Sequence, residues 1–383
     1  MSVKLLKAEL TPDKKLCNTN KAGNEIYVVD CFDAPNVLQE IGRLREIAFR
    51  DSGGGTGKSR DLDEFDLEQD RLYKQLIIWD PDASAILGGY RYILGPDMIF
   101  DEQGQPVLAS AHLFRFSEAF IRDYLPRTME LGRSFVTPEY QSSKAGAKAI
   151  FALDNLWDGL AALMLKYPKM RYYFGKMTFY PDYDKSSLAL IDRFLYKHFP
   201  DPDALVVPKE PYRVDIDGRV LDLILRDQDF KQDYRNLKEA VRRLGTGIPP
   251  LVNAYMNSSP TMKMFGSSIN DEFFDSIETG ILINFYEMYA DKRYRHKEPY
   301  LRHLAESVRR RIPKLRQETN ETMERLRRKV QRKKKKEKVE PSAGFCFALS
   351  FIFATYPLAS GGPPSSASIF GLAGPGAVPV RHR

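Results

Sequence analysis

Between Thr128 and His198 the chain alternates between short β-rich runs and longer runs of helical periodicity. The four runs are predicted in order as strand, helix, strand and helix: Thr128–Val136, Ala145–Lys166, Arg171–Thr178 and Ser186–His198. Two strands joined through a helical crossover become parallel neighbours of one sheet. This order therefore predicts an α/β fold.

An antiparallel hairpin is predicted ahead of that unit. Asp80-Pro81-Asp82 has turn composition and separates the β-rich runs Leu76–Trp79 and Ala85–Ile93. A hairpin that leads into a β-α-β-α unit predicts a mixed central sheet with helices on both faces. Other segments are predicted as a strand at Ile26–Asp30, a helix from Asp33 to Ala48, a helix near Phe114–Tyr124, a helix near Asp229–Leu244 and a strand near Gly280–Phe285. The region from Asp201 to Ala290 is expected to complete the same domain.

The net charge of +7 is concentrated in one segment. Ser307–Lys338 holds 15 Lys and Arg against 4 Asp and Glu, so the preceding body is mildly acidic. We predict a basic helical extension over Leu301–Lys338, interrupted at Pro313. A nucleic-acid function would rest on this extension alone, and we expect no nucleic-acid partner. A solvated helix or one that contacts a carrier protein or a membrane surface fits the same charge pattern.

The C-terminal segment 341–383 has 6 Gly, 6 Pro, 7 Ala and 6 Ser among 43 residues and no acidic residue. That composition predicts a low-complexity, disordered tail. Its apolar run, Gly344–Ala359, has 16 residues, fewer than the roughly 18 needed to span a bilayer. The expected domains are thus 1–300, 301–340 and 341–383. The N-terminus lacks the apolar core of a signal peptide and the three cysteines form no close pair, so we expect a cytoplasmic protein.

Two short segments resemble known motifs, but the residues around them do not fit those motifs. Gly53–Ser59 resembles a phosphate-binding P-loop, but Ser52 replaces its first glycine and a helix precedes it, so we interpret the segment as a loop beside a site. His198 and Asp203 have the His-x4-Asp spacing of glycerolipid acyltransferases, with two prolines between them and no Gly-rich second motif. No His or Cys pair has metal-ligand spacing, so no metal site is predicted.

A set of charged residues is tied to the predicted sheet. Its members are Arg45 and Phe49 at the end of the first helix, Asp63 and Asp66 before the hairpin, Arg91 within it, and Glu130, Arg133 and Ser134 on the strand Thr128–Val136. Alternation along that strand puts Glu130, Gly132 and Ser134 on one face and Leu131 and Arg133 on the other. From spacing alone the set is either a structural ion-pair network or a functional site.

In order, Arg45-x3-Phe49, Glu64-Phe65-Asp66, Gly89-x-Arg91 and Glu130-Leu-Gly-Arg133 resemble the acyl-homoserine lactone synthases and related GNAT-fold N-acyltransferases. The sequence is most similar to the glycine or ornithine N-acyltransferases often labelled hemolysin-like. The resemblance covers about Ile26 to Tyr289. It implies a GNAT-like sheet and transfer of a long-chain, 3-hydroxy fatty acyl group from acyl carrier protein to an amino acid's α-amine, with glycine favoured.

The resemblance also implies roles for individual residues. Glu130 would be the base or a water-mediated proton acceptor, and Asp63 and Asp66 would position the ammonium group. Arg91 and Arg133 would hold the substrate carboxylate, because guanidinium matches a carboxylate bidentately. Arg45 and Phe49 would help bind substrate, and the backbone from Ser134 would bind the thioester carbonyl. The acyl carrier protein thioester is a co-substrate, its pantetheine arm is expected between the strands Thr128–Val136 and Arg171–Thr178, and no cofactor is implied.

Three alternatives remain open at this point. The first is an ornithine N-acyltransferase that makes lyso-ornithine lipid. The second is a glycerolipid acyltransferase that uses His198 and Asp203. The third is a non-enzymatic, hemolysin-like protein that binds membranes through Lys333–Lys336 and the apolar tail. The basic extension would also give an enzyme peripheral contact with the inner membrane.

Overall fold

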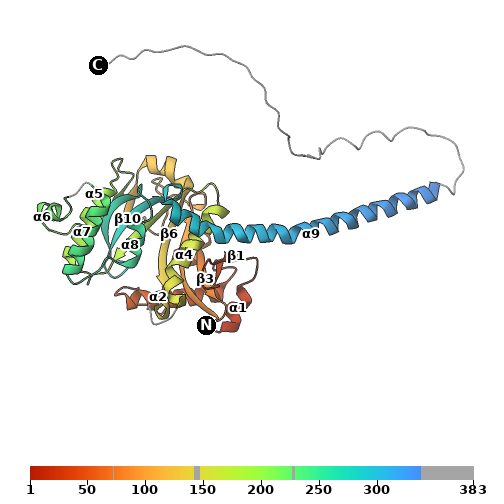
Figure 1. Ribbon diagram of the computed structural model, residues 1–383, viewed down its shortest axis with the longest axis horizontal. Helices are drawn as coiled ribbons and strands as arrows, with labels where there is room; N and C mark the ends of the chain where they lie inside the picture. Colours follow the sequence, from red (N-terminus) through yellow and green to blue (C-terminus); the bar gives the residue numbers. More distant parts are fainter. Residues whose placement is uncertain (72, 142–146, 227–228, 338–383) are drawn as a thin grey trace, which may run out of the picture. The chain divides into compact units, whose positions relative to one another are not determined.

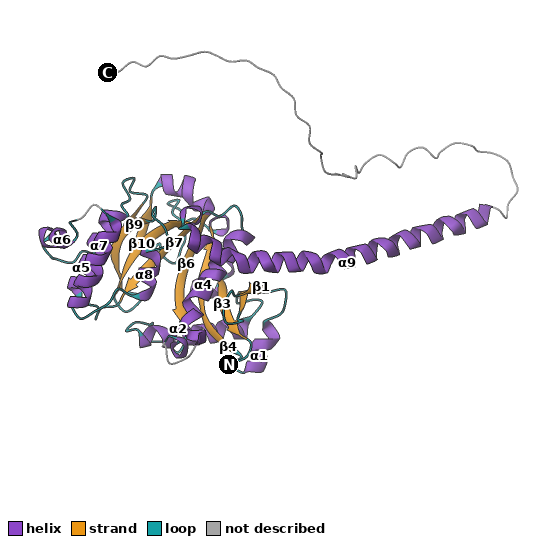
Figure 2. Cartoon of the chain, viewed as in Figure 1, coloured by secondary structure: helices purple, strands orange, loops and turns teal. Residues whose placement is uncertain are grey.

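The computed structural model describes residues 1–71, 73–141, 147–226 and 229–337. The chain divides into two units, Met1–Lys314 and Leu315–Arg383. The first unit is built on an eight-stranded sheet (Figures 1 and 2). In spatial order its strands are β1 (Lys15–Asn18), β2 (Glu25–Val29), β3 (Lys74–Asp80), β4 (Ala85–Leu94), β6 (Thr128–Val136), β7 (Tyr172–Phe179), β10 (Ser276–Asn284) and β9 (Lys263–Asn270).

Neighbouring strands of this sheet are antiparallel with one exception. β6 and β7 are parallel, and α4 (Ala147–Lys166) is the crossover between them. The hairpin of β3 and β4 turns where the Asp80 carboxylate accepts hydrogen bonds from the backbone N–H groups of Asp82 and Ala83. The mixed sheet and the α/β class are therefore confirmed, and β9 and β10, which follow Asp201, belong to the same sheet.

Helices cover both faces of the sheet (Figure 2). On one face, α4 packs with α5 (Lys185–His198), α7 (Phe230–Arg243) and α8 (Pro250–Met256) over Leu76, Leu131 and Met177. On the other, α1 (Val3–Glu9) and α2 (Pro35–Asp51) cover Ile77, Trp79 and Phe135. We call these the α4 face and the α2 face. The short helices α3 (Glu64–Leu67) and α6 (Gly218–Ile224) complete the unit.

The predicted helix near Phe114–Tyr124 is wrong in its first half. Phe114–Phe116 forms β5, which pairs with β8 (Val206–Pro208) in a two-stranded sheet, and the chain becomes helical only from Glu118, with a π-helical turn at Phe120–Tyr124. Phe114 and Phe116 are both buried against Phe174, while Arg115 between them is exposed. This period of two is typical of a strand, and it outweighed the helical spacing of the residues that follow.

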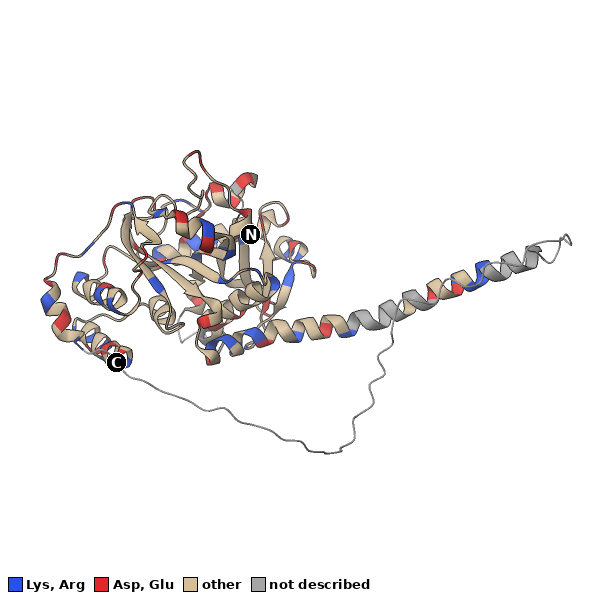
Figure 3. Ribbon diagram, turned by 90° about the horizontal axis from the view of Figure 1, so that it is seen from above, with Lys and Arg blue, Asp and Glu red and all other residues tan. Residues whose placement is uncertain are grey.

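The basic extension belongs to one long helix, α9 (Ala290–Glu337), so the predicted interruption at Pro313 is wrong. A proline removes one backbone hydrogen bond, and the surrounding Arg, Lys, Leu and Glu are good helix formers. The predicted boundary at residue 300 falls inside α9 and stays a prediction. Basic residues recur along α9, interspersed with acidic ones (Figure 3).

Within the first unit, the start of α9 is fixed to α4. His296 Nδ1 lies 2.6 Å from a carboxylate oxygen of Asp158, whose other oxygen accepts the backbone N–H of Asn20. In the second unit the described helical residues 321–329 are exposed. The predicted tail 341–383, with its apolar run, lies outside the described residues. Among the residues that are described, no helix is both long and apolar enough to cross a bilayer.

The close contact of β4 and β6 gives a test of the fold. A Cβ at Gly88 would lie 2.5 Å from the backbone oxygen of Phe135, whereas a Cβ at Gly132 would meet nothing within 4 Å. We expect Gly88→Ala to lower the free energy of unfolding by about 1–3 kcal/mol, because the two strands must move apart. Gly132→Ala serves as the matched control in urea denaturation. Equal stability of the two variants would contradict this packing.

Candidate active site

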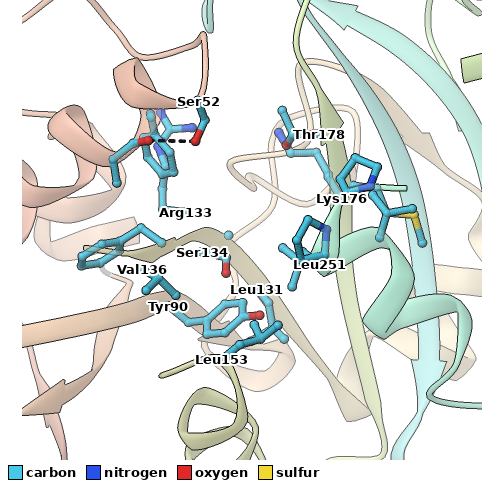
Figure 4. A pocket seen from close by; sticks show the side chains of 18 of the residues that line it. Ser52, Tyr90, Leu131, Arg133, Ser134, Val136, Leu153, Lys176, Thr178 and Leu251 are labelled. Carbon is cyan, nitrogen blue, oxygen red and sulfur yellow. Dashed lines mark hydrogen bonds between the residues drawn. The ribbon is translucent and has the colours of Figure 1, made fainter. Parts of the chain in front are cut away.

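A gap opens in the middle of the sheet between β6 and β7. The two strands pair only at Thr128–Glu130 and Tyr172–Phe174. Beyond these residues β6 stays paired with β4 as far as Val136, and β7 stays paired with β10 as far as Phe179. The strands therefore diverge, and a cavity of about 380 Å³ lies between their diverging ends (Figure 4).

A β-bulge in β6 shapes one wall of this cavity. Gly89 pairs with Phe135 and Arg91 pairs with Gly132, so Arg133 and Ser134 together oppose the single residue Tyr90. Arg133 has a φ of 49°, the left-handed conformation that such bulges use. The extra residue turns Arg133 to the α2 face, the side of Arg91, and puts Ser134 beside Tyr90 on the α4 face. The predicted alternation is thus wrong from Arg133 onward.

The cavity has an apolar half and a charged half, because side chains alternate along the diverging strands. The apolar half lies toward α4 and α8 and is lined by Leu131, Leu153, Met177, Leu251, Val252 and Tyr255. The charged half lies on the α2 face and contains Arg133, Lys176, Thr178 and Glu278. Figure 4 shows Arg133 and Lys176 on opposite sides of the gap, with Leu153 and Leu251 below them.

Behind the charged half lies a buried network of ion pairs. Arg45 Nη2 is 2.7 Å from Asp66 Oδ2, and Arg91 Nη1 is 3.1 Å from the same oxygen. Gln75 donates to Asp66 Oδ1 at 2.8 Å, and Arg91 also pairs with Asp63. Burial alone would raise the pKa of Asp66, but Arg45 and Arg91 hold it well below its usual value. Asp66 is thus the shared counter-ion of two buried guanidinium groups.

Arg133 links the network to the cavity. Its Nε lies 3.0 Å from Asp61 Oδ2, and its Nη2 lies 3.5 Å from Asp63 Oδ2. Its guanidinium carbon lies 4.8 Å from the centroid of the Phe273 ring, which adds a cation–π contact. Of the arginines predicted for the site, Arg133 is the one that lines the cavity, and 18% of its side chain is exposed. Arg45 and Arg91 are fully enclosed behind it.

Glu130 lies on the α2 face but does not line the cavity. One of its carboxylate oxygens accepts hydrogen bonds from the hydroxyl and backbone N–H of Ser110, and the other accepts from the Tyr73 hydroxyl. Burial raises the pKa of Glu130, although the bonds from Ser110 and Tyr73 act in the opposite direction. Phe49, Arg133 and Ser134 line the cavity, whereas Arg45, Asp63, Asp66, Arg91 and Glu130 lie behind it. The roles assigned to all eight residues stay predictions.

The sequence prediction missed Lys176, Thr178 and Glu278. The antiparallel register of β7 and β10 places Glu278 directly opposite Thr178, and Lys176 shares their face. Glu278 is an acidic residue inside the otherwise uncharged run Ser276–Asn284, and only 3% of its side chain is exposed. A carboxylate within such a strand is a signal that could have been noticed, since buried charges need partners.

The Gly-rich segment lies beside the cavity, as interpreted. Ser52 lines the cavity, and the backbone N–H groups of Thr56 and Gly57 donate to the Glu46 carboxylate at 3.0 and 2.9 Å. The Glu46 carboxylate of α2 therefore accepts hydrogen bonds from the backbone amides that a P-loop would donate to phosphate.

The His198 and Asp203 pair does not form. His198 Nε2 lies 2.9 Å from Asp233, whereas Asp203 lies beside Lys263, and neither residue lines the cavity. The two residues therefore do not form the His–Asp pair that a glycerolipid acyltransferase would need. Within the described part of the chain, no group of three or more His, Cys, Asp or Glu side chains is arranged to hold a metal ion.

Comparisons with known proteins identify acyltransferases as relatives of this chain. Residues 44–149 match the family described as an acetyltransferase (GNAT) domain. A glycine Nα-acyltransferase of Phocaeicola vulgatus is 55% identical over 308 residues, which cover 80% of this chain and 94% of the relative. A glycine Nα-acyltransferase of Bacteroides thetaiotaomicron is 56% identical over 301 residues, 79% of this chain and 89% of the relative.

Among solved structures, a CoA-dependent acyl-homoserine lactone synthase with SAM and isopentyl-CoA is similar over 73% of this chain and 90% of its own. The TM-score is 0.31 and the identity 10%, so this likeness supports no inference about substrates.

The buried network predicts a specific loss of stability. Asp66→Asn should lower the free energy of unfolding at pH 7 by about 3–5 kcal/mol, because it leaves Arg45 and Arg91 without their shared counter-ion. Since the pKa of Asp66 is lowered on folding, its contribution is present above its ordinary pKa of 3.8 and is lost as the pH falls below that value.

Urea denaturation from pH 7 to pH 3 measures this effect, and the variant should lack part of the wild-type acid slope. Asp222→Asn, which breaks the surface pair with Arg193, is the control and should resemble the wild type. A pH-independent difference between Asp66→Asn and the wild type would contradict the account.

Proposed function

Because the chain belongs to the family of glycine Nα-acyltransferases, and is therefore an acyltransferase, we propose that it transfers a fatty acyl group from a thioester to the α-amine of glycine. The observation that carries this proposal is the cavity between β6 and β7, which joins an apolar half to a charged half. A fatty acyl chain and a small zwitterion need these two environments side by side.

The divergence of the strands supports binding of an extended thioester arm. Past Glu130 of β6 and Phe174 of β7, the edges that face the gap pair with no other strand in the described part of the chain. An extended amide-containing chain could bind to the backbone N–H and C=O groups there, as an added strand would. We therefore assign the pantetheine arm to this gap, with backbone N–H groups near Ser134 as donors to the thioester carbonyl.

The apolar half is assigned to the fatty acyl chain. Each methylene group removed from water contributes about 0.8 kcal/mol, so a long chain gains affinity from walls such as Leu131, Met177 and Val252. We propose a long-chain donor of the 3-hydroxy class and an N-acylglycine lipid as the product. Arg133 is assigned to the glycine carboxylate because its guanidinium reaches the cavity.

We propose acyl carrier protein as the donor and α9 as a region that attracts it. Acyl carrier proteins are acidic, and basic groups on a partner increase the rate of encounter. In the second unit, exposed helical residues include Arg325, Arg327, Arg328 and Lys329. The same basic residues would favour contact with anionic lipid, and we propose a cytoplasmic enzyme that contacts the inner membrane peripherally.

A direct assay tests the function. Purified full-length protein is supplied with 3-hydroxyacyl carrier protein or the matching acyl-CoA, each with glycine, ornithine or serine, and products are quantified by mass spectrometry. We expect N-acylglycine as the main product and a higher rate with the carrier protein. Exclusive acylation of ornithine would overturn the glycine assignment, and equal rates with both donors would overturn the donor assignment.

A cavity-narrowing variant tests where the acyl chain binds. Leu251→Trp should lower kcat/KM at least tenfold more for a 16-carbon donor than for a 4-carbon donor, because the indole ring of tryptophan would fill the apolar half. Leu223→Trp is the control, since Leu223 is 75% exposed on α6 and lies outside the cavity. The same loss for both chain lengths would show that the chain binds elsewhere.

A further inference from the structure

The charged half of the cavity holds one carboxylate and two cations among the described residues that line it. The carboxylate is Glu278 of β10, and the cations are Lys176 of β7 and Arg133 of β6. An α-amino acid carries one ammonium and one carboxylate group, so this set has the complementary charges. Lys176 and Glu278 belong to none of the ion pairs of the network behind Arg133.

Four side chains contact the Glu278 carboxylate. Its Oε2 accepts a hydrogen bond from Thr178 Oγ1 at 3.1 Å and lies 3.7 Å from Lys176 Nζ. Its Oε1 lies 3.3 Å from Ser276 Oγ and 3.4 Å from Asn270 Nδ2, both within hydrogen-bond contact. These contacts fix the carboxylate at the cavity wall, and the long ones leave it capacity for a stronger donor such as an ammonium group.

The other carboxylates of the predicted site are less accessible to a ligand in the cavity. Asp66 is fully buried and shared between Arg45 and Arg91, and Asp63 pairs with Arg91 and Arg133. Glu130 uses both oxygens to bind Tyr73 and Ser110, and it does not line the cavity. Glu278 is therefore the carboxylate that a ligand ammonium in the cavity meets directly.

We propose that Glu278 accepts the proton of the glycine α-ammonium group and that Lys176, with Arg133, binds the glycine carboxylate. This inference rests on the proposed function and identifies the acceptor subsite of the same cavity. It makes Glu278 the catalytic base and makes Glu130 a positioning residue, which acts through Tyr73 and Ser110 on the α2 face.

The proposed proton transfer balances with the reaction. The ammonium group first gives one proton to Glu278, which leaves a neutral amine that attacks the thioester carbonyl carbon. A C–N bond forms, the C–S bond breaks, and the nitrogen's next proton passes to the departing thiolate, giving a thiol. Glu278 then releases its proton to solvent. The net products are an amide, a thiol and one proton.

Polar groups of the neighbouring elements surround the Glu278 carboxylate. Lys176 and Thr178 face it from β7, Asn270 from β9 and Arg133 from across the gap, while His112 contacts Asn270 at 3.2 Å and Tyr180 directly follows β7. Burial lowers the pKa of Lys176, and the nearby Glu278 raises it. A glycine carboxylate that enters beside Lys176 would favour its charged form in the same way.

The central experiment compares Glu278→Gln with the wild type at pH 7, using full-length protein, acyl carrier protein thioester and two acceptors. With glycine, kcat should fall at least about 100-fold, a loss typical for removal of a general base. With hydroxylamine, which is already unprotonated at neutral pH, transfer to give a hydroxamate should fall less than tenfold. The glycine reaction of the variant should also recover as the pH is raised, because free amine then forms in solution.

Lys176→Met provides an independent readout that does not require Glu278→Gln to fold. It should raise KM for glycine at least tenfold and leave KM for the acyl donor unchanged. The matched controls are Glu287→Gln and Lys263→Met, whose side chains lie outside the cavity and pair with Thr261 and Asp201. Both controls should retain wild-type kinetics.

The outcomes separate this inference from the proposed function. Wild-type protein that makes no N-acylglycine with any donor would refute the function itself. An active wild type with unaffected Glu278→Gln and Lys176→Met variants would overturn only the subsite. Glu130→Gln that loses glycine transfer but keeps hydroxylamine transfer, beside an unaffected Glu278→Gln, would assign the base to Glu130. Equal losses with both acceptors in Glu278→Gln would reduce Glu278 to a structural role.

Discussion

The separation of β6 from β7 after three paired residues is the constraint on which the rest of the structure depends. Each strand keeps its outer partner, β4 or β10, along the length over which β6 and β7 are separated. The bulge at Arg133 then turns a cation toward the α2 face, and alternation along β7 turns Lys176 and Thr178 the same way. One cavity thus receives apolar side chains from one face of the sheet and charged ones from the other.

The buried ion pairs behind the cavity give that geometry its rigidity. A guanidinium group enclosed without solvent is tolerated only when carboxylates surround it, and Asp66 serves both Arg45 and Arg91. Asp61 and Asp63 extend the same network to Arg133. Most of the charged residues predicted for the site therefore hold one another in place, and Arg133 alone among their guanidinium groups lines the cavity.

The sequence could predict the class and most of the elements because their signals are local. Alternation and helical spacing located β6, β7, α4 and α5, and turn chemistry located the hairpin at Asp80. The faces of Arg133 and Ser134 could not be predicted, since a bulge leaves no mark in a period-two pattern. Glu278 was missed because its importance comes from register: β10 returns almost 100 residues after β7 and pairs Glu278 with Thr178.

In the proposed reaction, the acyl donor and glycine meet in the gap between β6 and β7. A crystal structure of the protein with N-palmitoylglycine, the joined product, tests this most directly. We expect the amide to lie between the two strands, the chain to extend toward Leu153 and Leu251, and the carboxylate to lie within hydrogen-bond distance of Lys176 or Arg133. Product bound at another surface, with the gap empty, would contradict the claim.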